Sequence, residues 1–235
     1  MSRLIKTFDM IRKILFVLLC CCSLSVAAQT KARKTKSAVK AISQKEMRKV
    51  YEEVRTPYKY GLVIAPQTNN KKYDCPTVFR EGDSWYMTYV CYNGNGGTDG
   101  RGYETWLAKS EDLLHWQTLG RILAFGDHGW DMNQRGGFPA LIDYDWGGNY
   151  NINKFKGRYW LTYIGGEGTG YEAVNAPLSI GLASTSENIS TAHLWDTYDS
   201  PILSYKDKNA QWWEKMTQYK STVYQVDKKK FGYQF

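Results

Sequence analysis

Two Tyr-Glu pairs, each within a Gly-Tyr-Glu tripeptide, join an aromatic ring to a carboxylate at fixed spacing. Tyr103 and Glu104 follow one Gly-rich loop, and Tyr171 and Glu172 follow another. An aromatic ring stacks on the apolar face of a sugar, and a carboxylate accepts hydrogen bonds from pairs of hydroxyl groups. The sequence therefore predicts substrate-binding contacts to a glycan at these four residues. Because the pair is repeated, an architectural role is the alternative.

A second group places an aromatic ring, a carboxylate and a guanidinium group within a few residues of one another. These are Trp130, Asp131 and Arg135, and His128 lies just before them. We interpret Trp130 and Arg135 as substrate-binding residues and Asp131 as a candidate for acid/base catalysis. His128 is the histidine closest to this group.

One pattern of strands occurs twice in the chain. This repeat must position the Tyr-Glu pairs and the group around Trp130. A Pro-led apolar strand, a glycine and an aromatic strand occur at 76–89 and again at 139–163. A third strand follows each copy, at 105–110 and 180–185, and a tryptophan then precedes a fourth. Four strands per repeat is the content of one β-propeller blade. The sequence therefore predicts an all-β propeller fold.

A third copy begins at 221–224, and its second strand begins at 230–235. A propeller closes by radial repetition, so we expect two blades and the start of a third from an N-terminal fragment, with completion by a partner as the alternative. In a blade, the loop between the second and third strands lies on the same face as the start of the first. The Tyr-Glu pairs and the Trp130 group are thus expected on one face.

Three runs of residues carry a resemblance to a known family. They are Tyr-Asp-Cys-Pro at 73–76, Trp-Tyr-Met-Thr-Tyr at 85–89, and a run at 110–116 that fits the pattern S-x-D-L-x-x-W. With these, residues 60–235 resemble the five-bladed β-propeller glycoside hydrolases, the group around families 43 and 32 with relatives such as families 117 and 130. The resemblance implies cleavage of poly- or oligosaccharides by carboxylate acid/base chemistry, with carbohydrate as the partner and no cofactor.

The resemblance also implies a role for Asp74. These enzymes commonly place an Asp just before a Pro at the axial mouth of the first blade, and Asp74 matches with Cys75 inserted. Its expected role is general base or nucleophile, and a second carboxyl group must protonate the leaving oxygen. Family 43 enzymes usually carry that acid at the same place in a later blade, but here Gly137 stands in the second copy and 218–220 contains no acid.

The general acid therefore stays open. The candidates are Asp131, Glu214, Glu172, a histidine, or a residue beyond position 235. We predict Asp74, Asp131 and Glu214 as the catalytic set.

The N-terminus predicts export. Arg12 and Lys13 precede an apolar run that ends in Val-Ala-Ala at 26–28, which is typical of a cleaved signal peptide over 1–28. The apolar run is too short to span a bilayer, so no transmembrane anchor is expected after cleavage. The expected location is periplasmic or extracellular.

Between the signal peptide and the body, residues 29–42 have the composition of a flexible basic linker. Residues 43–59 predict a short helix that begins with a capping box of Ser43 and Glu46. The net charge of +8 belongs to these leading segments, because 1–28 carries +3 and 29–59 carries +7, leaving −2 for 60–235. The near-neutral body lacks the basic surface of a nucleic-acid-binding protein.

Cys75 and Cys91 are the two cysteines that remain after cleavage. They either pair in an oxidising compartment or serve as buried structural thiols. Neither zinc spacing nor a cluster of oxygen ligands predicts a metal. The oligomeric state is left open.

Three other functions compete with hydrolysis. A non-catalytic carbohydrate-binding propeller is favoured by the missing acids in the second and third copies. A phosphorylase would need basic residues to hold phosphate, for which Arg135 is the one candidate. An inactive remnant of an interrupted gene is the third.

Overall fold

The computed structural model describes residues 41–55, 61–95, 99–145, 147–171, 176–227 and 230–234, with 226–227 and 230–234 described through their backbone alone. The chain divides into two units, Met1–Lys59 and Tyr60–Phe235. The predicted signal peptide and all but the end of the predicted linker lie outside the described residues. Within the described part of the chain, every helix is too short or too polar to cross a membrane.

The first unit contains helix α2, Gln44–Val54. The predicted capping box is present. The hydroxyl oxygen of Ser43 accepts a 3.1 Å hydrogen bond from the amide of Glu46, whose carboxylate accepts a 3.0 Å bond from the amide of Ser43. Hydrogen bonds donated to the carboxylate by the hydroxyl and then by the amide of Ser43 lower the pKa of Glu46. The helix ends at Val54, three residues before Pro57, which was predicted to end it, and Arg55 is already extended.

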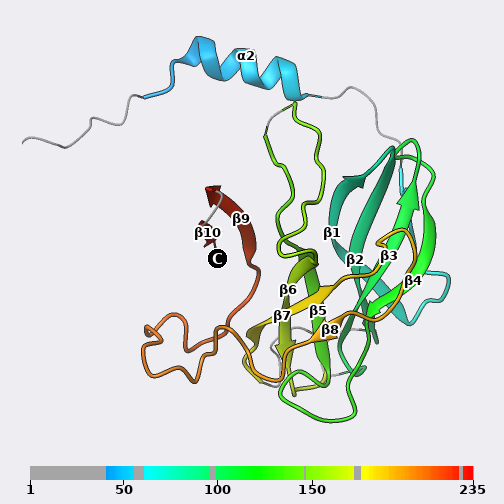
Figure 1. Cartoon of the computed structure of the whole chain (residues 1–235), viewed down its shortest axis with the longest axis vertical. Coiled ribbons are helices and arrows are strands. Elements are labelled where there is room, and N and C mark those ends of the chain that lie inside the picture. The colour runs from blue at the N-terminus through cyan, green and yellow to red at the C-terminus, as the bar shows by residue number, and fades with distance from the viewer. Residues whose placement is uncertain are drawn as a thin grey trace, which may run out of the picture. The chain divides into compact units, whose positions relative to one another are not determined.

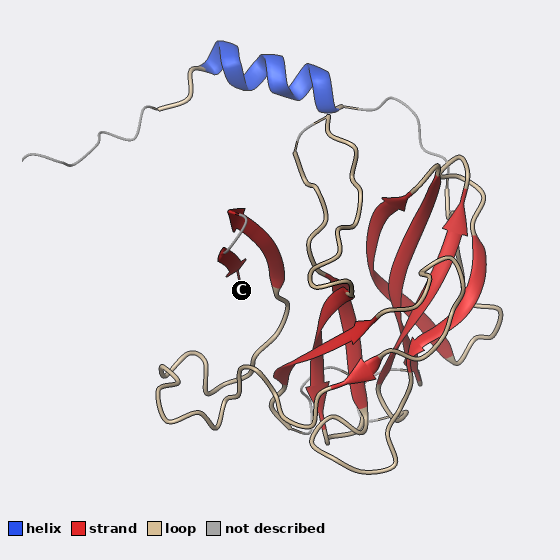
Figure 2. Ribbon diagram, in the orientation of Figure 1, coloured by secondary structure: helices blue, strands red, loops and turns tan. Residues whose placement is uncertain are grey.

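The second unit is built from strands, as the sequence predicts (Figures 1 and 2). Its first four strands form an antiparallel meander: β1 (Lys71–Glu81), β2 (Ser84–Asn93), β3 (Tyr103–Ser110) and β4 (Gln117–Leu123). The next four repeat the arrangement: β5 (Gln134–Pro139), β6 (Tyr159–Gly166), β7 (Ser179–Thr185) and β8 (Asp196–Thr197). We call these two groups blade 1 and blade 2.

A hairpin follows blade 2, formed by β9 (Thr222–Asp227) and β10 (Lys230–Gln234). It lies where the third copy of the repeat is predicted. A single parallel bridge between Tyr103 and Gln134 joins blades 1 and 2 into one sheet that does not close on itself. The all-β prediction of two blades and the start of a third is confirmed.

The main apolar core lies between the two blades. Phe79 and Leu107 of blade 1 pack with Leu161, Tyr163 and other buried side chains of blade 2. Successive side chains point to opposite faces of each strand, and in β2 and β6 both faces are largely buried. Burial of this shared face fixes blade 2 against blade 1.

Strand β5 differs from the prediction by register. The sequence repeat aligns 139–142 with 76–79, but β5 spans Gln134–Pro139. Thr88 pairs with Thr77, and Thr162, its counterpart in blade 2, pairs with Phe138. By strand pairing Pro139 therefore corresponds to Val78, and the sequence alignment is two residues out of register there. A bulge between Asp74 and Thr77 adds one residue to β1, which reduces the difference to one residue at Asp74.

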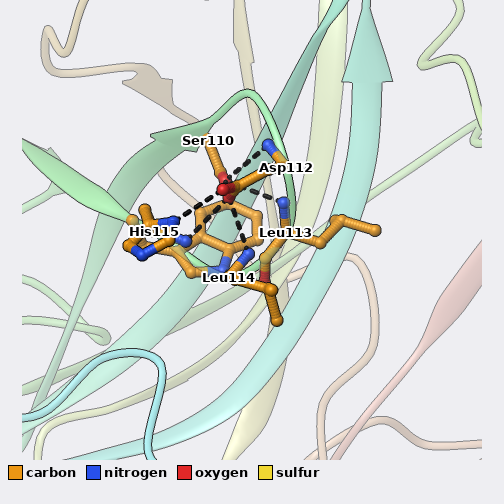
Figure 3. Close-up of polar contacts among 6 residues, drawn as sticks. Ser110, Asp112, Leu113, Leu114 and His115 are labelled. Carbon is orange, nitrogen blue, oxygen red and sulfur yellow. Dashed lines mark hydrogen bonds and ion pairs between the residues drawn. The ribbon is translucent and has the colours of Figure 1, made fainter. Parts of the chain in front are cut away.

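The S-x-D-L-x-x-W run forms the turn between β3 and β4 (Figure 3). Oδ1 of Asp112 accepts hydrogen bonds from the amides of Leu114 and His115, and its Oδ2 lies 2.6 Å from Nδ1 of His115. The indole of Trp116 donates to the carbonyl of Leu113 at 2.9 Å. Hydrogen bonding, first from the His115 side chain, holds the pKa of Asp112 well below its usual range. The run therefore builds a turn, and His115 belongs to that turn.

Candidate functional site

Three connections meet at one end of the sheet, which we call the loop end. They are 124–133 between β4 and β5, 167–178 between β6 and β7, and 198–221 between β8 and β9. In Figure 1 the first and third appear as the green and orange loops at the lower end of the strands. The sequence predicts that the Tyr-Glu pairs and the Trp130 group lie on one face of the blades. The connections next to these groups do lie at one common end of the sheet.

Two pockets open at the loop end and share Trp130. The smaller, about 150 Å³, has Glu167 and Lys206 in its lining, together with residues of β6, β7 and the connection to β9. The larger, about 550 Å³, is lined by Asp127, His128 and other residues that include Asp131, Arg135, Tyr198 and Asp199. The predicted Trp130, Asp131 and Arg135 thus lie at a pocket.

The indole of Trp130 is held in place from one side. It stacks on the ring of Tyr163, with centroids 5.7 Å apart and planes at 21°. Gly165 lies against it so closely that a Cβ there would come within 2.4 Å of the indole. A glycine is required at 165 for this packing. The fixed ring forms a wall common to both pockets.

The carboxylate of Asp131 is buried, and both of its oxygens are occupied. Arg135 donates to Oδ1 at 2.9 Å, and the hydroxyl of Tyr163 donates to Oδ2 at 2.6 Å. Arg135 also donates to the carbonyl of Ala124 at 3.0 Å. Burial first, and then the Asp131 contact, raise the pKa of Tyr163. These three residues hold the 124–133 connection against β6. Because both oxygens of Asp131 already accept hydrogen bonds, the arrangement suits a structural role better than proton transfer.

Asn133 links two of the three connections through buried hydrogen bonds. Its Oδ1 accepts from Nε of Arg101 at 2.6 Å, and its Nδ2 donates to the carbonyl of Glu167 at 2.6 Å. Arg101 also donates to the carbonyls of Gly126 and Met132. Arg101 and Asn133 therefore hold 124–133 against the start of the loop that carries Glu167.

Gln134 makes a matching bridge one residue later. Its Oε1 accepts from the amide of Tyr103 at 3.2 Å, and its Nε2 donates to the carbonyls of Gly168 and Gly170 at 3.0 and 2.9 Å. The side chain is fully buried. Sequence reasoning missed both amides, because neither lies in a motif. In the sequence they are marked only by being two adjacent polar residues at the start of an inner strand.

Glu167 is a candidate that sequence reasoning also missed. It follows the last residue of β6, Gly166, its side chain is exposed, and it lines the smaller pocket together with a lysine, Lys206. Because its backbone carbonyl is held by Asn133, its position is set by the loop network. A solvent-accessible carboxylate at a pocket can exchange protons with a ligand.

The tyrosines of the two Tyr-Glu pairs pack together. Tyr103 lies 5.8 Å from Tyr171, and Tyr92 completes the cluster at 5.5 and 5.2 Å from them. Glu104 is buried and forms a 2.8 Å ion pair with Arg121. Glu172 lies outside the described residues. These contacts favour the architectural alternative for Tyr103, Glu104 and Tyr171, and their role in glycan binding stays a prediction.

Asp74 lies on the bulge of β1 with an exposed side chain. Its Oδ1 accepts a 2.6 Å hydrogen bond from the amide of Cys75, which has a left-handed φ of 51°. Burial raises the pKa of the Cys75 thiol, and the nearby ammonium of Lys220 opposes this. Strand pairing places Asp74 opposite Val90, and Gly136 opposite Ile164 at the corresponding point of blade 2.

The equivalent of Asp74 in blade 2 is thus Gly136, one residue before the predicted Gly137. A Cβ at Gly136 would lie 3.0 Å from Ile164 and 3.1 Å from Val90. A side chain at this position would therefore require Ile164 and Val90 to shift. Tight packing at the inner strand explains why the second copy has no acid at this place.

Glu214 is part of a local turn. Its Oε2 accepts a 2.5 Å hydrogen bond from the amide of Gln211, and its carbonyl accepts from the side chain of Gln218 at 3.0 Å. The three predicted catalytic carboxylates therefore differ in setting: Asp131 is buried in an ion pair, Glu214 caps a turn, and Asp74 is exposed at the first inner strand. Cys75 and Cys91 are both free thiols.

Comparison with solved structures shows which proteins the chain is similar to. One structure described as "Glycoside hydrolase" and another described as a complex of BT0996 and RGII are each 66% identical to this chain, with a TM-score of 0.77. Each alignment covers 80% of this chain and 53% of the other. No protein-family model and no curated protein matches the chain.

The chain is therefore similar over most of its length to a glycoside hydrolase, and the resemblance inferred from residues 60–235 is confirmed. It spans about half the length of the relatives it matches.

Proposed function

We propose that this chain acts in an exported glycoside hydrolase that cleaves poly- or oligosaccharides at the loop end. The observation that carries the proposal is the smaller pocket, which combines the fixed indole of Trp130 with the carboxylate of Glu167 and the ammonium of Lys206. A stacking ring with a few convergent polar groups suits a sugar ring. The 66% identity to a glycoside hydrolase supports the same class of substrate.

The chemistry requires two carboxyl groups, one facing the anomeric carbon and one protonating the leaving oxygen. We assign the second role to Glu167, because its carboxylate is exposed at the pocket, whereas those of Asp131 and Glu214 are held by other groups. Asp74 retains the role of base or nucleophile that the family resemblance implies. The separation of the two carboxyl groups would decide whether the anomeric configuration is retained or inverted.

RGII is the first substrate to test, since one of the 66% identical structures is described as an RGII complex. The experiment incubates the chain with RGII oligosaccharides and measures the release of reducing sugar. Glu167→Gln and Asp74→Asn should each lower the rate about 100-fold or more without loss of fold by circular dichroism. Asp127→Asn, which removes an exposed acid from the neighbouring pocket, is the matched control and should retain activity.

Full activity in both Glu167→Gln and Asp74→Asn would contradict the assignment of the catalytic pair. A wild-type chain that binds RGII oligosaccharides without releasing sugar would favour a non-catalytic carbohydrate-binding propeller. Gly136, which stands in blade 2 where an acid would be needed, is the observation in favour of that second function.

Export rests on the sequence of residues 1–28 and is tested separately. Cell fractionation should find the chain outside the cytoplasm, with a mature N-terminus near Gln29 by N-terminal sequencing. A cytoplasmic chain that retains residues 1–28 would overturn this part of the proposal.

A further inference from the structure

The connection between β8 and β9 carries two indoles that point into solvent. Trp212 and Trp213 are 77% and 55% exposed, with ring centroids 5.4 Å apart and planes at 84°. Met216 beside them is 73% exposed. Burying an aromatic or methionine side chain normally stabilises a protein. A cluster of large apolar side chains left in water therefore marks a binding surface.

The segment that presents these indoles has a defined conformation. Glu214 closes the turn through its 2.5 Å bond from Gln211. Downstream, Thr217 and Gln218 anchor the segment to the start of β7, since Leu178 donates to Oγ1 of Thr217 at 2.9 Å and accepts from the amide of Gln218 at 2.9 Å. The two indoles are thus held outward by a hydrogen-bonded turn. Glu214, predicted as a catalytic residue, serves this turn.

The same segment begins at the smaller pocket. Tyr205 and Lys206 line that pocket, and the turn with Trp212 and Trp213 follows a few residues later. Between them, Lys208, Asn209 and Gln211 supply donors and acceptors that match sugar hydroxyls. Exposed indoles flanked by amides and ammonium groups suit a glycan better than an apolar protein face.

We propose that Trp212 and Trp213 form a second sugar-binding platform, which holds the part of a glycan that extends beyond the pocket. The proposal rests on the proposed function, because it places the terminal sugar of the same glycan in the pocket lined by Trp130 and Glu167. The platform would confer a preference for longer oligosaccharides over single glycosides.

The test compares the wild type with Trp212→Ala and Trp213→Ala. Calorimetry measures binding of RGII oligosaccharides of about four or more units, and a panel of 4-nitrophenyl glycosides reports hydrolysis of single sugars. Each variant should raise the Kd for the long oligosaccharides about tenfold, while the rate on any 4-nitrophenyl glycoside that is cleaved stays unchanged. Leu194→Ala removes an exposed apolar side chain from the β7–β8 connection and should change neither quantity.

The outcomes separate this proposal from the hydrolase function. If the wild type cleaves no substrate but its binding to long oligosaccharides depends on the two tryptophans, the platform is supported and the hydrolase proposal fails. If sugars are cleaved and both variants bind long oligosaccharides as the wild type does, the platform is wrong and the hydrolase proposal stands. Variants that only abolish self-association in sedimentation experiments would also overturn the platform.

Discussion

Nδ2 of Asn133 donates a 2.6 Å hydrogen bond to the backbone carbonyl of Glu167, joining the residue before β5 to the residue after β6. The same side chain accepts from Arg101 through Oδ1. One buried side chain thus connects blade 1, the 124–133 connection and the proposed general acid. The position of Glu167 depends on this amide, so substitutions at Asn133 should alter the geometry of the smaller pocket.

Asn133→Leu should lower the free energy of unfolding by about 2 kcal/mol or more, because it leaves the carbonyl of Glu167 and the guanidinium of Arg101 without this partner. Asn133→Asp is the matched variant. It keeps an acceptor for Arg101 and loses the donor to Glu167, so a smaller loss is expected. Urea denaturation of the three chains measures both effects. Equal stability of the leucine variant and wild type would show that the bridge is dispensable.

Asp131→Ala should destabilise the fold by about 3 kcal/mol, because Arg135 is then left mostly buried without its carboxylate. The side chains of Asp131 and Arg135 are 5% and 16% exposed. Asp127→Ala, at an exposed position four residues earlier, should change stability by less than about 0.5 kcal/mol. Thermal and urea unfolding give the comparison. If Asp131→Ala were as stable as Asp127→Ala while sugar release was lost, Asp131 would be catalytic instead of supporting.

Alkaline pH should destabilise the fold through Cys91. Burial raises the pKa of its thiol from 9.0 to about 11, so the unfolded chain loses this proton at lower pH than the folded chain. The contribution of the protonated Cys91 thiol to the free energy of unfolding is complete below pH 9 and is lost as the pH rises to about 11. The loss amounts to about 2 kcal/mol. Urea denaturation across this alkaline range measures it.

Cys91→Ala is the control for this pH effect, and its free energy of unfolding should fall less steeply over the same range. Tyr163 and Tyr89, whose pKa values burial also raises, account for the slope that remains. Identical slopes in the wild type and the Cys91→Ala variant would exclude Cys91 as the source.

Local patterns in the sequence predicted several features correctly. Ser43 and Glu46 form their capping box, because its bonds join residues three positions apart. The aromatic runs at 85–89 and 159–163 predict β2 and β6, since aromatic and β-branched residues favour strands. The bulge at Asp74 was not predicted, and the two repeats were aligned two residues out of register at Pro139 and one residue out at the position of Asp74.

The loop end was less predictable. Glu167, Asn133 and Gln134 lie in no motif, and their contacts reach 31 to 36 residues along the chain. Asp131 was predicted as an acid/base residue from its type and its neighbours. Its ion pair with Arg135 depends on four-residue spacing that the sequence contains, but its burial and its bond from Tyr163 depend on how blade 2 packs.

The sequence by itself determined the repeat, the all-β class and the family resemblance, because strand periodicity and turn residues are local properties of the chain. Only the tertiary structure decided which carboxylates remain accessible. Arg135 and Tyr163 occupy the carboxylate of Asp131, and a turn occupies that of Glu214. The close approach of Val90 and Ile164 crowds any side chain larger than that of glycine at 136. Accessibility depends on neighbours that are distant in the chain, so it exists only after the blades have packed.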